Sequence, residues 1–487
     1  MKADLIIIGG GIVGTTIARE LSKYKLQVLL VEKEADIGFG STKANTGIIH
    51  AGYDDIPGTI KANLCVRGNT LWPQIAAELG IPFIRTGSWV VACKDEEANT
   101  ILKLKRRGIM NNVPGLQIID DRKQLLMLEP NISNKVLLAL YAPTAGIISP
   151  YEAAIALAEN AYHNGVQIQL ETEVKDILLE KNAIVGIRTN RGLIETNSVI
   201  NAAGIYSDEI SAMCGINHFS ITPVRGEYFV LDKNLNGYVR HILFPVPTPV
   251  SKGIVVSKTV AGNLIIGPNA NNVNEKTDLA TTKPGLNEVF EGAQKLVPGL
   301  ASKRGMVITI FAGLRAESSI GDFIIEAYDS PRGFINVAGI KSPGLTAAPA
   351  IAEKVIQLLK NMDSDLNEKK NYNPSRESIQ RTIDSLSTNQ SWTNMPKDPN
   401  YGHMICRCEH VSEGEIVEAI QRGANTFDGI KFRTRAGMGR CQGGFCTPHL
   451  IRILSRELDL KAKSITKHGR FSSIVPYEVK ESLMEER

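Results

Sequence analysis

Near the N-terminus an apolar run stops abruptly at glycines, because DLIII (4–8) is followed by GGGIVG (9–14). The apolar run predicts a buried parallel strand, and residues 12–24 predict the helix that follows it. Residues 27–32 (QVLLVE) predict a second strand. The chain is therefore expected to open with a βαβ unit, in which glycines let helix and strand pack closely at the turn.

The glycines have the spacing G-x-G-x-x-G at Gly9, Gly11 and Gly14. Such a turn brings backbone N–H groups close to the pyrophosphate of a dinucleotide at the N-terminus of a helix. Glu32 ends the second predicted strand, where it is placed to accept hydrogen bonds from a ribose. A strand-to-helix turn can also use glycines without a ligand. Because strand, helix and acidic residue stand in the expected order, we predict a dinucleotide site.

Composition narrows the class of protein. The chain has 487 residues, a formal charge of only +4, and 43% hydrophobic residues. That length allows about three domains, and the small charge predicts no nucleic-acid partner. The first apolar run is far shorter than the ~20 residues of a membrane span or the apolar region of a signal peptide. We expect a cytoplasmic protein, at most peripheral at the inner face of the membrane.

Later segments suggest how this first unit is completed. A predicted helix begins at 151, and short strands are predicted in VQIQL, AIVGIRT and SVINAAG, as in the second half of a dinucleotide domain. The β-rich segments EYFVLD (227–232), GIVVS (253–257), NLIIG (263–267), MVITIFAGL (306–314) and FIIEA (323–327) predict an antiparallel sheet in a second domain. A glycine-bearing turn, 338–345, then leads into a helix to about residue 360.

The expected fold class is α/β, with a Rossmann-like dinucleotide domain interrupted by an antiparallel-sheet substrate domain. Residues 361–400 are rich in polar residues and proline, which predicts a partly helical linker. The predicted boundaries are about 1–80, 145–215 and 310–360 for the dinucleotide domain, 81–144 and 216–309 for the substrate domain, 401–455 for a small C-terminal module, and 456–487 for a tail.

The small module contains four of the seven cysteines, as C-x-C at 406–408 and C-x4-C at 441–446. Such pairs among glycines suit a metal–thiolate site, because a short loop aims two sulfurs at one centre. Structural zinc favours C-x2-C pairs but stays an alternative, as does a redox dithiol. The remaining cysteines are expected to be buried packing residues; they are Cys65, Cys93 and Cys214.

The choice between NAD and FAD depends on the segment after Glu32. A loop of small residues, GFGSTKANTGIIHAGY (38–53), follows it closely. A nicotinamide domain has no need of such a loop there, whereas a chain that binds the longer FAD must pass along the rest of the cofactor. The loop therefore favours FAD.

With these motifs the chain resembles FAD-dependent oxidoreductases of the D-amino-acid-oxidase-like superfamily, and within it the glycerol-3-phosphate dehydrogenase and L-2-hydroxyglutarate oxidase group. The resemblance covers residues 1 to about 360 and is carried by IIIGGGIVG (6–14), VEKE (31–34), STKANTGIIHAGY (41–53), NAAGIYSDEI (201–210), PVRGEY (223–228), FAGLRA (311–316) and AGIKSPGLTAAPAIAE (338–353). The module resembles the bacterioferritin-associated-ferredoxin-like [2Fe–2S] domain through ICRCEHVSEGEI (405–416) and TRAGMGRCQGGFC (434–446).

The resemblance implies which residues hold the cofactors. For FAD they are Gly9, Gly11, Gly14, Glu32, Ser41, Thr42, Asn45, Gly47, Gly204, Gly339, Lys341, Gly344 and Leu345. For the cluster they are Cys406, Cys408, Cys441 and Cys446. Lys341 could place positive charge near the flavin pyrimidine, and the alternative is a solvated lysine.

The resemblance also implies that His50 and Arg315 face the substrate. Oxidising an alcohol by hydride transfer requires a base for the hydroxyl proton, and a histidine suits that task. An anionic substrate requires a fixed cation, and an arginine provides a two-pronged donor. The alternatives are a structural His50 held within its loop and an Arg315 paired with Glu317. Arg225 is a weaker candidate for substrate binding.

We therefore predict an FAD-dependent dehydrogenase of a small anionic 2-hydroxy compound, with sn-glycerol 3-phosphate first. Hydride would pass to flavin N5, and electrons would leave singly through the [2Fe–2S] cluster to a partner protein or second flavoprotein subunit. Alternatives are L-2-hydroxyglutarate or an amino acid such as proline as substrate, or an electron-transfer subunit of a complex.

Overall fold

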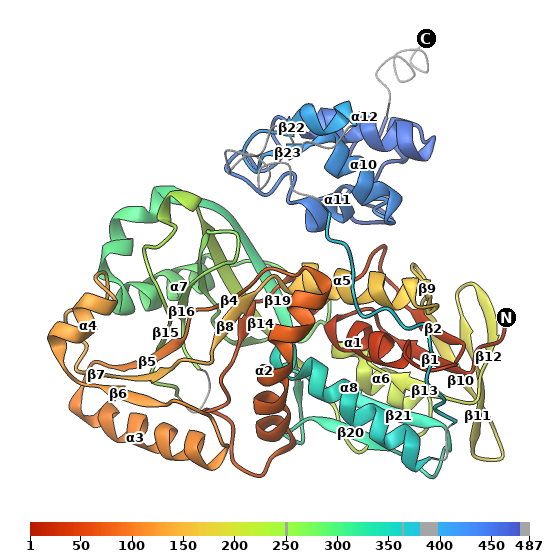
Figure 1. Ribbon diagram of the computed structural model, residues 1–487, viewed down its shortest axis with the longest axis horizontal. Helices are drawn as coiled ribbons and strands as arrows, with labels where there is room; N and C mark the ends of the chain where they lie inside the picture. The colour runs from red at the N-terminus through yellow and green to blue at the C-terminus, as the bar shows by residue number, and fades with distance from the viewer. Residues whose placement is uncertain (249–251, 363–364, 380–397, 478–487) are drawn as a thin grey trace. The chain divides into compact units, whose positions relative to one another are not determined.

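The computed structural model of the protein describes residues 1–248, 252–362, 365–379 and 398–477. The chain divides into two compact units (Figure 1). The larger unit comprises Met1–Lys33 and Gly38–Arg376, and the smaller unit comprises Glu34–Ile37 and Glu377–Arg487. Each unit has its own hydrophobic core.

The central layer of the larger unit is a six-stranded sheet with the spatial order β20-β21-β13-β1-β2-β9. Its strands are β1 (Leu5–Ile8), β2 (Val28–Val31), β9 (Gln167–Gln169), β13 (Val199–Asn201), β20 (Ile324–Ala327) and β21 (Phe334–Ala338). Strand β1 pairs in parallel with β2 and β13, and helix α1 (Ile12–Leu21) connects β1 to β2. The predicted βαβ opening is confirmed.

The two faces of this sheet are covered differently, because side chains alternate along each strand. Ile6 and Ile8 pack against a three-stranded antiparallel sheet and α6. Helices α1, α5, α8 and α2 form a contiguous group beside the sheet (Figure 1). The elements are β10 (Val174–Glu180), β11 (Ala183–Thr189), β12 (Gly192–Glu195), α2 (Ile60–Leu79), α5 (Pro150–His163), α6 (Ser207–Ala212) and α8 (Gly344–Asn361).

The second layer of the larger unit is a nine-stranded sheet with the order β18-β14-β17-β16-β15-β5-β7-β6, in which β19 also pairs with β14. Its strands are β5 (Ser88–Ala92), β6 (Gln117–Ile119), β7 (Leu138–Ala142), β14 (Ile221–Leu231), β15 (Ile242–Pro245), β16 (Val255–Lys258), β17 (Leu264–Gly267), β18 (Asn271–Asn272) and β19 (Val307–Ser318). All pairs except the parallel β15–β5 pair are antiparallel. The predicted antiparallel sheet is thus present, with three strands from the segment before 145.

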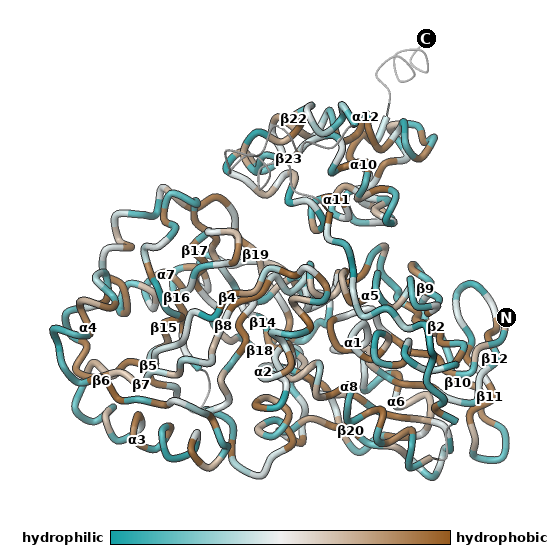
Figure 2. Tube along the Cα trace, viewed as in Figure 1, coloured by the Kyte–Doolittle hydropathy of each residue, from teal (hydrophilic) through white to brown (hydrophobic). Residues whose placement is uncertain are grey.

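Helices cover both faces of this sheet. Helix α7 (Lys283–Leu296) packs on one face and α3 (Asp95–Met110) on the other. A short helix, α4 (Arg122–Leu128), lies beside β7. In Figure 2 the hydrophobic colour concentrates within the layers, and hydrophilic colour marks many of the outer turns. A separate three-stranded sheet has the order β3-β8-β4, with β3 (Ile48–Ile49), β8 (Gly146–Ile148) and β4 (Phe83–Arg85).

One predicted strand belongs to a different sheet. FIIEA (323–327), expected in the antiparallel sheet of the second domain, forms β20 at the edge of the six-stranded sheet. It turns back as a hairpin on β21, with Ile324 opposite Ala338. The apolar pattern indicates a strand but not its partner, and here the hairpin partner already lies in the parallel layer. The assignment of this segment to the second sheet was wrong.

The described part of the smaller unit has three α-helices and a two-stranded sheet. These are β22 (Met404–Cys406), β23 (Val411–Ser412), α10 (Glu413–Gln421), α11 (Phe427–Thr434) and α12 (Thr447–Leu458). A capping box between Ser412 and Glu415 begins α10, and Leu450, Ile453 and Leu454 of α12 pack into the core. Much of the predicted linker, 380–397, and the last tail residues, 478–487, lie outside the described residues.

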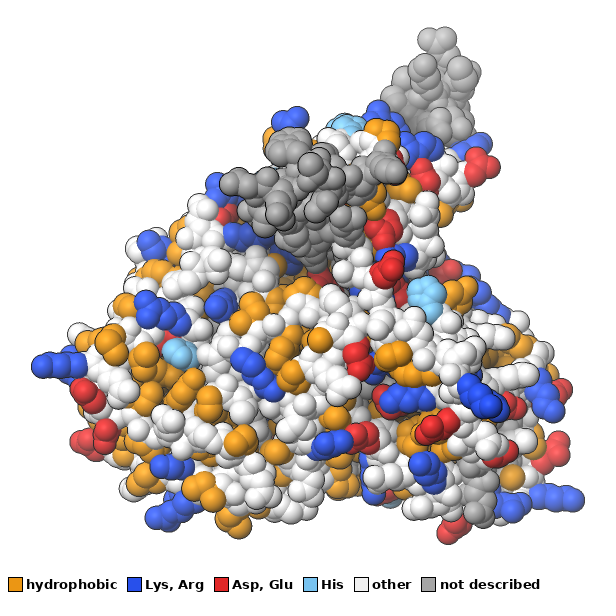
Figure 3. All heavy atoms as spheres, in the orientation of Figure 1, with side chains coloured by type: hydrophobic (Ala, Val, Ile, Leu, Met, Phe, Trp, Pro, Cys, Tyr) orange, Lys and Arg blue, Asp and Glu red, His pale blue; other side chains and the backbone are white. Residues whose placement is uncertain are grey.

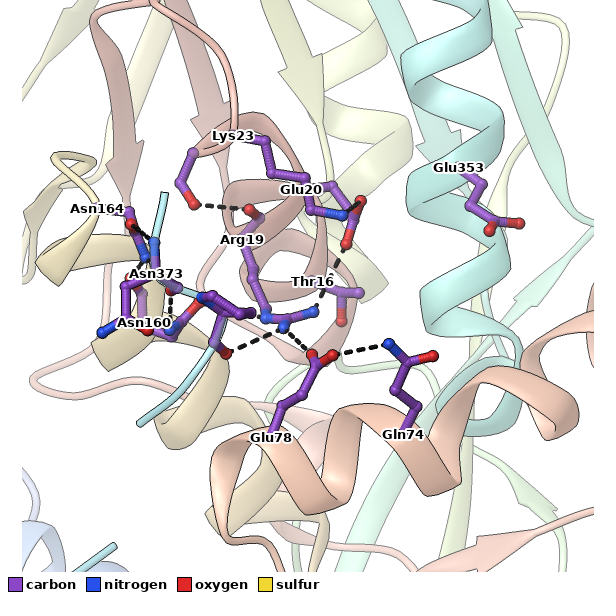
Figure 4. A network of polar contacts seen from close by, with 12 residues as sticks. Thr16, Arg19, Glu20, Lys23, Gln74, Glu78, Asn160, Asn164, Glu353 and Asn373 are labelled. Carbon is purple, nitrogen blue, oxygen red and sulfur yellow. Dashed lines mark hydrogen bonds and ion pairs between the residues drawn. The ribbon is translucent and has the colours of Figure 1, made fainter. Parts of the chain in front are cut away.

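A strap of residues 365–376 lies along the helices of the larger unit (Figure 4). Asn160 Nδ2 donates to the carbonyl oxygen of Asn373 over 3.1 Å. Arg19, only 3% exposed, donates to Glu78, to Asn160 Oδ1 and to the carbonyl oxygen of Pro374. One buried guanidinium therefore joins α1, α2, α5 and the strap.

On the face of the larger unit that Figure 3 shows, positively charged Lys and Arg side chains are mixed with negatively charged Asp and Glu side chains. Within the described ranges, none of the helices is both long and apolar enough to cross a lipid bilayer.

We predict that Arg19→Ala destabilises the larger unit by about 2 kcal/mol, because Glu78 and the Pro374 carbonyl lose their shared donor. Thermal unfolding should show a melting temperature lowered by a few degrees. Lys23→Ala removes a partly exposed ion pair with Glu20 within one helix end and serves as the control, with a smaller expected change. Equal melting temperatures for the two variants would contradict the role given to Arg19.

Candidate functional site

The glycine turn at the end of β1 leaves no room for a side chain at Gly9 or Gly14. Gly9 has φ +111°, and a Cβ there would run into the backbone of Ala202 at the end of β13. A Cβ at Gly14 would collide with the carbonyl oxygen of Gly9. The Gly10 N–H donates to Glu32 Oε2 over 2.6 Å. The turn, the start of α1 and the acidic residue after β2 therefore form one cradle, as a dinucleotide site requires.

The loop after Glu32 lines the same cradle. Thr42 Oγ1 accepts a hydrogen bond from the Ile12 N–H at the start of α1, over 2.9 Å. Ser41 Oγ donates to the carbonyl oxygen of Leu314 over 2.6 Å, and Asn45 Nδ2 donates to that of Thr42 over 2.8 Å. Contacts between distant segments thus hold this predicted FAD-binding loop in place.

Glycines again mark close approaches around the loop. Gly47, with φ +72°, passes so near the carbonyl oxygen of Ile148 that a Cβ would not fit. Gly204 has φ +60° and opens the 3-10 turn after β13. Gly339, with φ +66°, ends β21 beside Ser318. These predicted residues lie at the ends of the strands and loops that carry the cradle, an arrangement that fits an extended cofactor.

The segment 338–345 lies directly beside His50. Ser342 Oγ is 3.3 Å from His50 Nε2. The Gly344 N–H donates to the carbonyl oxygen of Lys341 and begins α8, whose first turn includes Leu345. Lys341 Nζ forms an ion pair with Glu317, so the structure pairs Glu317 with Lys341 and not with Arg315.

The backbone of His50 is held on both sides. Its N–H donates to Thr346 Oγ1 over 2.9 Å, and its carbonyl oxygen accepts from Asn69 Nδ2 over 2.8 Å. Burial lowers the pKa of the imidazole to about 3, and the nearby Lys252 ammonium adds to this effect. At neutral pH the ring is therefore uncharged and able to accept a proton.

Lys252 is a site residue that the sequence did not indicate. With Tyr53, Asp54 and Phe244 it lines a small cavity that also reaches His50. Lys252 Nζ lies 2.8 Å from Asp54 Oδ2. Burial alone would lower the pKa of Lys252, but Asp54 and Asp55 outweigh it and raise that pKa. The lysine is therefore a half-buried cation, held by Asp54, in the same cavity as a neutral histidine.

Arg315 and Arg225 project from adjacent positions of the β14–β19 pair. Arg315 stands opposite Val224, whereas Arg225 stands opposite Leu314, so their side chains lie on opposite faces. Arg315 lies over Gly226, where a Cβ would collide with its guanidinium, and donates to the carbonyl oxygen of Asn269.

The partners of the two arginines differ. Arg225 is 10% exposed and pairs with Asp278 over 2.5 Å and with Glu227 over 3.8 Å, as a structural ion pair would. Arg315 is half-buried. Burial raises the pKa of Tyr228, and the charge of Arg315 opposes this rise. Tyr228 also forms a side-chain hydrogen bond with Thr46, in the loop that leads to His50. Arg315 is thereby linked to the loop that carries His50.

Some of the missed residues left a signal in the sequence. Asp54 follows the quoted motif 41–53 directly, and so a carboxylate near His50 was visible there. Lys252 had no motif, because it follows β15 in a segment that only the folded sheet brings to His50.

The four cysteines of the smaller unit meet as two pairs. Cys408 Sγ and Cys441 Sγ are 3.6 Å apart, and Cys406 shares a hydrogen bond with Cys446. That hydrogen bond, with nearby backbone N–H groups, lowers the pKa of Cys406 to about 6 despite burial. Within the described ranges, no three or more His, Cys, Asp or Glu residues gather around one metal position. Two pairs of sulfurs fit a [2Fe–2S] cluster, whose irons take two thiolates each, better than one tetrahedral zinc.

Glycines make room for these sulfurs. A Cβ at Gly439 would collide with that of Cys408, and Gly443 turns the RCQGGFC loop at φ +90°. Backbone N–H groups of Gly443, Gly444 and Phe445 act on Cys441. The loop therefore offers its amides to a thiolate, as cluster loops do.

Comparison with known proteins identifies both parts of the chain. Residues 4–358 match the family described as FAD dependent oxidoreductase (DAO), and residues 404–456 match the BFD-like [2Fe-2S] binding domain. A glycerol 3-phosphate dehydrogenase of Caloramator mitchellensis is 49% identical over 474 residues, which are 97% of this chain and 98% of that protein.

Two other relatives cover less of the chain. An L-2-hydroxyglutarate dehydrogenase of Escherichia coli (strain K12) is 33% identical over 273 residues, 55% of this chain and 64% of that protein. The structure of dithionite-reduced L-α-glycerophosphate oxidase from Mycoplasma pneumoniae with FAD bound is 32% identical, with a TM-score of 0.73 over 77% of this chain and 98% of that one.

These findings confirm the predicted fold class, the cofactors FAD and [2Fe–2S], and an oxidoreductase. The chain belongs to the family of FAD-dependent oxidoreductases (DAO) and carries a BFD-like [2Fe–2S] domain over residues 404–456.

Proposed function

We propose that the protein oxidises sn-glycerol 3-phosphate to dihydroxyacetone phosphate and passes the electrons on through its iron–sulfur domain. The observation that carries this proposal is the neutral His50 in one cavity with the half-buried Lys252 ammonium. An alcohol that bears an anionic group needs both a proton acceptor and a cation at a fixed separation. This pair of groups suits a small phosphorylated or carboxylated alcohol.

In this proposal the chain's own residues hold the substrate and move its proton. Ser342 Oγ lies 3.3 Å from His50 Nε2, so this nitrogen faces the segment 338–345, and we assign it as the acceptor of the hydroxyl proton. Lys252 binds the anionic group, and Arg315 supplies a second cation from β19. FAD, bound by the glycine turn and the loop 41–47, supplies the hydride acceptor.

The domain over 404–456 favours a dehydrogenase. A [2Fe–2S] cluster accepts electrons one at a time, and an enzyme that reduced O2 at its flavin would not need it. The Caloramator relative, matched over nearly its whole length, is a glycerol 3-phosphate dehydrogenase. We place the protein in the cytoplasm, where thiolates stay reduced, with an electron-accepting partner protein.

An anaerobic titration of iron-reconstituted protein tests this function. The absorption bands of flavin and cluster are followed while sn-glycerol 3-phosphate, L-2-hydroxyglutarate and proline are added in separate experiments. Bleaching of both bands by micromolar sn-glycerol 3-phosphate is the expected result. Bleaching by one of the other compounds would transfer the assignment to it, and silence from all three would favour a partner-dependent subunit. Stoichiometric peroxide release in air would count against a dehydrogenase.

We predict that His50→Ala slows flavin reduction by sn-glycerol 3-phosphate about 10²- to 10⁴-fold, because the hydroxyl proton loses its acceptor. Stopped-flow absorbance under anaerobic conditions measures the rate. Ser342→Ala, which removes only a hydrogen-bond partner of the ring, is the matched control and should cost less than about tenfold. Nearly intact turnover in His50→Ala would contradict an alcohol mechanism and favour an amine substrate.

We predict that Lys252→Met lowers kcat/KM for sn-glycerol 3-phosphate about 10²-fold, because the half-buried cation that binds the anionic group is lost. The slow oxidation of uncharged glycerol should change little. Lys258→Met removes a lysine of β16 that does not line the cavity, so it should not reproduce the loss. Equal losses with both substrates would show a structural role for Lys252, and FAD content verifies folding.

We predict that Cys408→Ser lowers the iron content and the cluster absorption while FAD stays bound, because one of the two sulfurs of a pair is replaced. Substrate should still bleach the flavin. Cys93→Ser, at a half-buried cysteine outside the domain, should keep full iron content. The iron content of both purified variants tests this prediction. An unchanged iron content in Cys408→Ser would show that Cys408 is not a ligand of the cluster.

A further inference from the structure

The cysteine pairs of the smaller unit differ in their access to solvent. Cys406 and Cys446 are only 2% and 1% exposed. Cys408 and Cys441 are half-buried and lie 3.6 Å apart. One side of the cluster site therefore faces the core of the domain, and the other side reaches its surface.

Three exposed side chains stand next to these cysteines in the sequence. Arg407 separates Cys406 from Cys408, Arg440 precedes Cys441, and Phe445 precedes Cys446. Phe445 is 78% exposed, an unusual state for a large apolar side chain. We call Arg407, Arg440 and Phe445 the cluster-edge surface.

The exposed ionisable side chains of this surface are basic. Both of its arginines are exposed, as is the neighbouring His410. The nearest carboxylate in the sequence, Glu409, has a side chain that is only 2% exposed and lies 2.7 Å from Arg435 Nε. The exposed ionisable groups next to the cysteines in the sequence are therefore basic, whereas this carboxylate is buried.

The folding of the domain does not account for Phe445. Its core is formed by residues such as Ile416, Ile430 and Leu450, which are fully buried, while Phe445 lies on the outside of the RCQGGFC loop. An exposed aromatic side chain among cations is typical of a contact surface, in which an apolar centre is surrounded by charges that select the partner. Short-lived electron-transfer complexes need only a small surface of this kind.

We propose that the cluster-edge surface binds an acidic redox protein that accepts single electrons. The proposal rests on the proposed function only in that electrons must leave the protein. Carboxylates around the partner's own redox centre would face Arg407 and Arg440, and an apolar spot would face Phe445. One substrate molecule yields two electrons, so two molecules of the one-electron acceptor are reduced for each substrate oxidised.

The test measures binding to the oxidised, iron-reconstituted protein, without substrate. The probes are cytochrome c, which is basic, and its succinylated form, in which lysines carry carboxylates. We expect the succinylated form to bind at least about tenfold more tightly at low salt, and added salt to weaken that binding. Arg407→Gln with Arg440→Gln should remove the difference, and Phe445→Ala should weaken binding several-fold.

The matched control is Lys461→Gln with Lys467→Gln, which removes two exposed charges elsewhere in the smaller unit. It should keep the preference for the succinylated probe. An equal loss in this control would reduce the effect to net charge and overturn the proposal. Equal binding of both probes to the unaltered protein would also overturn it. Iron content and the cluster spectrum verify that each variant is folded.

Two other occupants of the surface give distinct results. If it bound the larger unit of the same chain, the arginine variants would slow cluster reduction by the substrate-reduced flavin and leave probe binding unchanged. If it bound a second copy, sedimentation would show a smaller assembly for Phe445→Ala. Either result would overturn the proposal. Failure of every substrate to bleach the flavin, with probe binding intact, would instead contradict the proposed function alone.

Discussion

The close contact between the glycine turn and the end of β13 is the constraint on which the larger unit depends. Gly9 passes against the backbone of Ala202, and Gly14 against Gly9 itself. This contact joins the first strand to one that lies far along the chain. Only then does the start of α1 meet Thr42, whose loop continues to His50. A side chain added at Gly9 would therefore disturb the cofactor cradle and the loop that carries the base.

Local sequence patterns predicted many of these strands, helices and turns, but they did not predict which distant segments lie beside one another. The glycine spacing, the strands on either side and Glu32 lie close together in the chain, and the structure has them as expected. The segment 323–327 was recognised as a strand but assigned to the wrong sheet, since an apolar run does not specify its neighbour. Lys252 shows the same limit at the site, because only the pairing of β15 with β5 and β16 positions the segment that follows.

The charges of the site illustrate why burial matters more than residue type. Arg225 and Arg315 occupy adjacent positions of the β14–β19 pair, yet Arg225 is neutralised by Asp278 and Glu227. Lys252 is half-buried and remains charged because Asp54 and Asp55 offset its desolvation. Burial lowers the pKa of His50, and the Lys252 ammonium adds to this effect, so the histidine is neutral. A substrate anion that approached Lys252 would add a further negative group beside Asp54 and Asp55. It would thereby favour a protonated His50, which is the state that the histidine reaches after taking the hydroxyl proton.

The pairing of the cysteines explains why the module has two short motifs and not one long one. Cys406 ends strand β22, and Cys408 follows it after Arg407 in the turn towards β23. The RCQGGFC loop carries Cys441 and Cys446. Each motif thus supplies one sulfur to a buried pair and one to a half-buried pair. Because both pairs draw on both motifs, the cluster would cross-link hairpin and loop, as a metal does in other small domains. The exposed residues between and beside the cysteines are then held rigidly at the edge of the cluster, where a partner can reach them.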